Sequence, residues 1–105
     1  MTNVFGTNLA PVDASSVEMG QITVGEASVR LSTVTSNTGP LSHGVWFTTA
    51  VSTFYINAGG ATTAVTVENG VMCKANNPLF IPIKDPSQIN LIASGADKLM
   101  TFVMS

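Results

Sequence analysis

Few side chains in this sequence could carry out catalysis, and their spacing does not bring them together. There is one histidine, His43, between Ser42 and Gly44, and one cysteine, Cys73. The acidic residues lie one per segment, at Asp13, Glu18, Glu26, Glu68, Asp85 and Asp97. A Ser-His-Asp triad needs three groups in contact, and no Gly-x-Ser-x-Gly turn is present to build one. We therefore expect no catalytic residues and a protein that is not an enzyme.

Metal and cofactor sites have equally little support in the sequence. A Cys/His zinc site takes four ligands, whereas the chain has one Cys and one His, and no Asp-x-Asp-x-Asp-Gly calcium loop occurs. The pair Gly59-Gly60 opens no helix and precedes no Lys-Ser or Lys-Thr, which excludes a phosphate-binding loop. We expect no metal and no cofactor, although carboxylates gathered by folding could still form a weak metal site.

The single thiol has two interpretations. Cys73 would be reactive if the neighbouring Lys74 lowered its pKa. It would be inert if it were a small apolar core residue at the end of a short strand, Val71–Lys74. We favour the core position.

Two aromatic pairs, Trp46-Phe47 and Phe54-Tyr55, are the other residues with chemical potential. Adjacent strand residues point to opposite sides, so one ring of each pair should enter the core and the other should face outward. An outward ring could line a protein interface or stack on a sugar. The alternation does not decide which ring is outward, and we select Trp46 and Tyr55 as candidate partner-contact residues.

The candidate residues must lie on strands or in loops, because apolar residues nowhere recur at the spacing of a helix. In Ala27–Val34, for example, Val29 and Leu31 alternate with polar neighbours. The expected strands are Ala27–Val34, Gly44–Ala50, Ser52–Ala58, Thr63–Glu68, Val71–Lys74, Leu79–Ile83, Gln88–Ala93 and Leu99–Met104. Seven to eight short antiparallel strands at near-regular spacing predict an all-β fold, a single small β-sandwich or barrel.

The joints between these strands carry turn residues. Asn69-Gly70 predicts a type I′ hairpin, Asn57–Gly60 a looser turn, and Ser94–Asp97 the last hairpin. The closing strand, Leu99–Met104, is apolar on both faces. It must therefore be central in a sheet or covered by something else.

The first twenty residues show no sustained period. Their apolar residues include Val4, Phe5, Leu9 and Val12. We interpret residues 1–20 as an extended arm, with a reach of about 60 Å at ~3.3 Å per residue, and residues 21–105 as the β-domain. A first strand folded back onto its own sheet and a disordered tail remain alternatives. The other long irregular segment is the loop Ser36–Gly44.

Charge is scarce in this sequence. The formal net charge is −2, and the four basic residues are scattered singly, so we expect no nucleic-acid partner. No stretch approaches the ~18 apolar residues of a membrane span and the N-terminus lacks a signal-peptide pattern, so we expect no membrane association. Ser and Thr number twenty-three and Asn eight, which predicts an uncharged polar surface. An uncharged polar surface costs less free energy to desolvate than a charged one, which suits burial between subunits. A β-rich composition alone would also account for the many Ser, Thr and Asn residues.

The order of these features resembles that of small virion proteins of tailed bacteriophages. The resemblance lies in Ser52–Gly60, Val65–Gly70, Asn77–Ile83, Ile89–Gly95 and the final strand. It covers roughly residues 27–105 and is a pattern of turns and apolar spacing, not a catalytic signature. One difference is that Pro82 and Pro86 lie on either side of residues 83–85, where such proteins more often have a Pro-Gly-Glu-type loop. The resemblance implies a β-sandwich that decorates, cements or connects a capsid or tail, usually as an oligomer.

From these patterns we expect a capsid decoration or cement protein, made in the host cytoplasm and located in the virion. Its partners would be the major capsid protein or other virion proteins, and it would be a homo-oligomer, with a trimer favoured. The expected contacts come from the arm residues and the two selected rings: Val4, Phe5, Leu9, Val12, Trp46 and Tyr55. A head–tail connector or tail component, as a ring of six or twelve, is the first alternative, and a carbohydrate-binding module is the alternative of another class.

Overall fold

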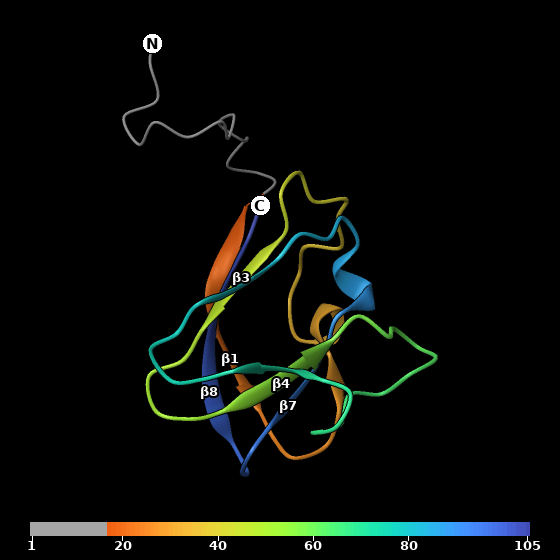
Figure 1. Cartoon of the computed structure of the whole chain (residues 1–105). Helices are drawn as coiled ribbons and strands as arrows, with labels where there is room; N and C mark the ends of the chain where they lie inside the picture. The colour runs from red at the N-terminus through yellow and green to blue at the C-terminus, as the bar shows by residue number, and fades with distance from the viewer. Residues whose placement is uncertain (1–16) are drawn as a thin grey trace.

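The computed structural model describes residues 17–105 as two four-stranded antiparallel sheets that enclose a common core (Figure 1). The first sheet consists, in spatial order, of β1 (Glu18–Val24), β8 (Lys98–Met104), β3 (Val45–Thr48) and β6 (Leu79–Ile81). The second sheet consists of β2 (Val29–Arg30), β7 (Asn90–Ala93), β4 (Phe54–Asn57) and β5 (Val71–Cys73). Helix in this part of the chain is limited to two 3₁₀ turns, η2 (Leu31–Thr33) and η3 (Pro86–Gln88). The expected all-β class with eight short antiparallel strands is confirmed.

The core forms where alternate side chains of both sheets meet. Phe47 and Phe102 come from the first sheet, while Phe54, Ile56 and Leu91 come from the second, and all five are buried. Full burial of an aliphatic or phenyl side chain contributes roughly 1.5–3 kcal/mol by transfer arithmetic. The strands are therefore held in place mainly by this double layer of apolar side chains.

The closing strand lies at the centre of its sheet, which is one of the two placements that its sequence allowed. β8 pairs with β1 on one side and with β3 on the other. Its inward residues Met100, Phe102 and Met104 are buried, whereas Leu99 on the other face is exposed. Because β8 is central, its backbone groups form hydrogen bonds with a neighbouring strand on each side. The side chains of its outer face remain partly exposed to solvent.

The segment Thr63–Glu68 is not a strand, and Asn69-Gly70 is not a type I′ turn. Neither residue of the pair has a positive φ. Instead, the Asn69 side chain accepts a hydrogen bond from the backbone N–H of Thr66 (2.8 Å) and donates one to the carbonyl of Ala64 (3.1 Å). Local bonds between an Asn side chain and the backbone compete with a sheet ladder, and here they replace it.

Two further connections differ from expectation. Ser94–Asp97 is not a hairpin within one sheet, because it joins β7 of the second sheet to β8 of the first. The strand expected over Ala27–Val34 is reduced to β2, since the chain turns into η2 at Leu31, which is buried. Both differences arise because the chain changes sheets at these points, which apolar alternation does not record.

The first strand, β1, was not among the expected strands, although a first strand folded back onto the sheet was one alternative to the arm. β1 begins at Glu18, so residues 18–20 of the expected arm belong to the first sheet. Its inward residues are Ile22 and Val24, both buried, and Gly20 interrupts the alternation on that face. The candidate arm contacts Val4, Phe5, Leu9 and Val12 lie outside the described residues.

A buried asparagine ties the loop 58–70 to the second sheet. Asn90 on β7 is 3% exposed, and its amide nitrogen donates to the carbonyls of Gly60 and Thr63 (2.9 Å each) and to Oδ1 of Asn57 (3.1 Å). No buried side-chain nitrogen or oxygen of residues 17–105 lacks a hydrogen-bond partner. The buried amide of Asn90 is thus fully used in hydrogen bonds to uncharged groups.

Replacement of Asn90 by Ala should therefore destabilise the fold. Loss of the amide leaves the carbonyls of Gly60 and Thr63 without this donor, at a cost of about 1–3 kcal/mol in the free energy of unfolding. Urea unfolding measures the change. The exposed Asn77 provides the control, since Asn77→Ala should stay within about 0.5 kcal/mol of the wild type. Equal stability of the two variants would contradict the role assigned to Asn90.

Candidate interaction surface

The two aromatic pairs divide between core and surface, as expected. Phe47 and Phe54 are fully buried, whereas Trp46 is 47% exposed and Tyr55 is half-buried. Trp46 faces outward from the first sheet and Tyr55 from the second. The two selected rings therefore lie on opposite outer faces and cannot form one platform.

Trp46 belongs to a line of apolar side chains that crosses all four strands of the first sheet. Trp46 is directly opposite Val103 of β8 and Phe80 of β6, and Val103 is directly opposite Met19 of β1. The rings of Trp46 and Phe80 lie with their centroids 4.9 Å apart and are tilted by 40°. Met19, at the other end, is 65% exposed. We call Met19, Val103, Trp46 and Phe80 the apolar row.

The side chains beside the apolar row are uncharged. The adjacent line across the sheet consists of Gln21, Thr101 and Thr48, and the next pairs Thr23 with Leu99. The strand register thus places no charged residue on the outer face of the first sheet. An exposed apolar line on a neutral surface is typical of a protein-binding site, because little desolvation cost opposes its burial.

The outer face of the second sheet offers less apolar surface. Tyr55 lies between Met72 of β5 and Ile92 of β7, and only Met72 of these neighbours is exposed. The next line across this sheet pairs Asn57 with Asn90, which hold the loop 58–70. This face is therefore more polar than the face that carries Trp46.

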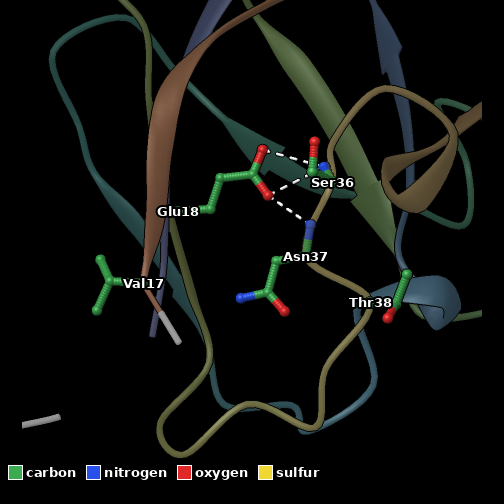
Figure 2. A pocket seen from close by; sticks show the side chains of 5 residues that line it. All are labelled: Val17, Glu18, Ser36, Asn37 and Thr38. Carbon is green, nitrogen blue, oxygen red and sulfur yellow. Dashed lines mark hydrogen bonds between the residues drawn. The ribbon is translucent and has the colours of Figure 1, made fainter. Parts of the chain in front are cut away.

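A hollow with a volume of about 510 Å³ lies where β1 begins (Figure 2). Val17, Glu18, Ser36, Asn37 and Thr38 line it. The Glu18 carboxylate accepts hydrogen bonds from the backbone N–H groups of Ser36 (3.0 and 3.1 Å) and Asn37, which Figure 2 shows as dashed lines. Glu18 thus fixes the loop 36–44 to the first strand, a role that the sequence analysis missed.

The sequence candidates for chemistry do not come together. His43 lies in the loop that ends at β3, and its backbone N–H donates to the carbonyl of Ser105 (2.7 Å). Cys73 lies in the core, as expected, and burial raises the pKa of its thiol. Within residues 17–105 no three His, Cys, Asp or Glu side chains are close enough to hold a metal ion together.

Comparisons with known proteins give no assignment. No family model, no curated protein and no solved structure matches the chain. None of the helical segments between residues 17 and 105 has the length and apolar character needed to span a membrane. Among the features of residues 17–105, the apolar row gives the clearest indication of a function, which is protein binding.

The buried position of Cys73 makes its thiol inert in the native protein. Because burial raises the pKa, a smaller fraction of the thiol is ionised at a given pH than in the unfolded chain, and access is restricted as well. Reaction with a thiol-specific disulfide reagent at mildly alkaline pH should be roughly tenfold or more slower in buffer than in denaturant. Equal rates in the two conditions would contradict the core position.

Proposed function

We propose that this protein is a structural component of a bacteriophage virion, most simply a capsid decoration or cement protein. In this role it binds the major capsid protein or other virion proteins through its surface. The observation that carries the proposal is the apolar row on the neutral outer face of the first sheet. The setting comes only from the resemblance of the sequence pattern to small virion proteins, and Val65–Gly70, one of the segments that carry it, does not form the expected hairpin.

The composition of the apolar row suits a protein partner. Aromatic residues and Met are enriched in the centres of protein interfaces, and Lys and Glu are depleted there. Trp46 and Met19 are the most exposed members of the row and would lose the most water-accessible surface on binding. Trp side chains are also among the residues that most often dominate binding energy.

The N-terminal segment is proposed to add contacts across a subunit boundary. Val4, Phe5, Leu9 and Val12 would contribute roughly 6–10 kcal/mol gross if they were buried at an interface, less the cost of ordering the segment. Repetition of these contacts in an oligomer would increase the apparent affinity further.

A head–tail connector or tail component would use the same surface, and the mass of the isolated oligomer separates the two roles. A trimer favours decoration, whereas a ring of six or twelve favours the neck or tail. A carbohydrate-binding module would place a sugar against Trp46, although the two residues directly opposite that ring, Val103 and Phe80, are apolar. Quenching of Trp46 fluorescence by a member of a glycan panel would favour the carbohydrate module.

The variant Trp46→Lys should lose most of its affinity for the assembled particle. The substitution removes the largest ring of the apolar row and places a charge at its centre. We expect particle binding to weaken roughly 30-fold or more, corresponding to about 2 kcal/mol. Val67, in the loop 58–70, is 60% exposed and lies away from the row, so Val67→Lys is the matched control. If both variants bound as the wild type does, the row would not be the binding surface.

Removal of residues 1–16 tests the N-terminal segment while leaving β1 intact. The shortened chain should fold, since the described core begins at β1, but its occupancy on particles should fall. Circular dichroism checks the fold and quantitative gel analysis of purified particles measures occupancy. Unchanged occupancy would remove the N-terminal segment from the proposal.

A further inference from the structure

The four edge strands of the two sheets differ sharply in how much backbone they leave open. The second sheet ends in β2, with two residues, and β5, with three. The first sheet ends on one side in β6, which has three residues and a proline beside each end, Pro78 and Pro82. Short edge strands and flanking prolines are common means of preventing another chain from pairing with an edge.

β1, at the other side of the first sheet, has none of these protections. It has seven residues and contains no proline, lysine or arginine. Its register with β8 runs without interruption from Glu18 opposite Met104 to Val24 opposite Lys98, so no bulge bends it away. β8 is its only partner strand among the described residues, and in an antiparallel strand the backbone groups of alternate residues point to the other side. β1 therefore presents an edge that another strand can extend.

We propose that two copies of this chain join through their β1 strands, antiparallel and about a two-fold axis near Gln21. Gln21 is the central residue of β1, so this axis brings the full length of both strands into register. The joined sheet would have eight strands. The same edge serves both copies, which is the arrangement that a two-fold interface requires.

The outward side chains of β1 are compatible with this pairing. Met19, Gln21 and Thr23 are uncharged, so no like charges would lie directly opposite each other on this face. In the proposed register Met19 lies opposite Thr23 of the second copy. Thr23 is opposite Leu99 within its own copy, and Leu99 is 54% exposed. The apolar row of each copy would therefore continue toward Leu99 of the other.

This pairing does not depend on the location of the protein, but it bears on the proposed capsid role, because a dimer would replace the trimer that favours decoration. The pairing concerns the association of the chain with itself. It predicts an even-numbered assembly, in place of the trimer expected from the sequence.

The test is a pair of opposite charges at the proposed axis. In Gln21→Lys, two ammonium groups would face each other across the axis, and in Gln21→Glu two carboxylates would do so. Each variant alone should dissociate roughly tenfold or more readily at low salt, as measured by sedimentation and native mass spectrometry. An equimolar mixture should restore dimers, and these should contain one copy of each variant.

Thr101 provides the matched control. It lies directly opposite Gln21 on the same outer face, but on the central strand β8, where it would be away from the axis. Thr101→Lys should therefore leave the dimer intact, and circular dichroism should show that all three variants are folded.

Four results would overturn the proposal. They are a wild-type chain that is monomeric at all concentrations, a wild-type trimer, Gln21 variants that dimerise as the wild type does, and a mixture that forms no heterodimer. If the full chain is monomeric and removal of residues 1–16 makes it dimeric, the chain's own N-terminal segment occupies this edge instead.

Discussion

The fold depends on the strand β8, which is central in the first sheet and has apolar side chains on both faces. Its inward residues, Met100, Phe102 and Met104, close the core against the second sheet. Its backbone is satisfied by β1 and β3 on either edge. Its outer face has no second layer among the described residues and retains Val103 within the apolar row. The need to cover this outer surface links the fold to the proposed association with other subunits.

Side-chain hydrogen bonds to the backbone fix two of the long loops. Asn90 holds the loop 58–70 through its contacts with backbone carbonyls, and Asn69 shapes the same loop from within. Glu18 is used in a similar way, since its carboxylate accepts from backbone N–H groups of the neighbouring loop. Among the described residues, the ionisable side chains either bind the backbone, as Glu18 does, or lie apart from one another.

Sequence patterns predicted several strands, including β3, β4 and β8, and the burial of Cys73. They failed where side-chain hydrogen bonds override β-propensity, as at Thr63–Glu68, and where the chain changes sheets, as at Ser94–Asp97. β1 escaped notice because Gly20 occupies an inward position and weakens the apolar period. The apolar row could not be predicted, because Met19, Trp46 and Phe80 are brought together by strand order, which no local pattern specifies.

The central claim is that other protein subunits cover the apolar surface left after the β-core closes. A density map of the assembled particle tests this claim most directly, because it places each face of the sandwich. The account predicts that Trp46 and Met19 lie against a neighbouring subunit. A particle in which the outer face of the first sheet is open to solvent, or in which the chain is missing, would contradict it.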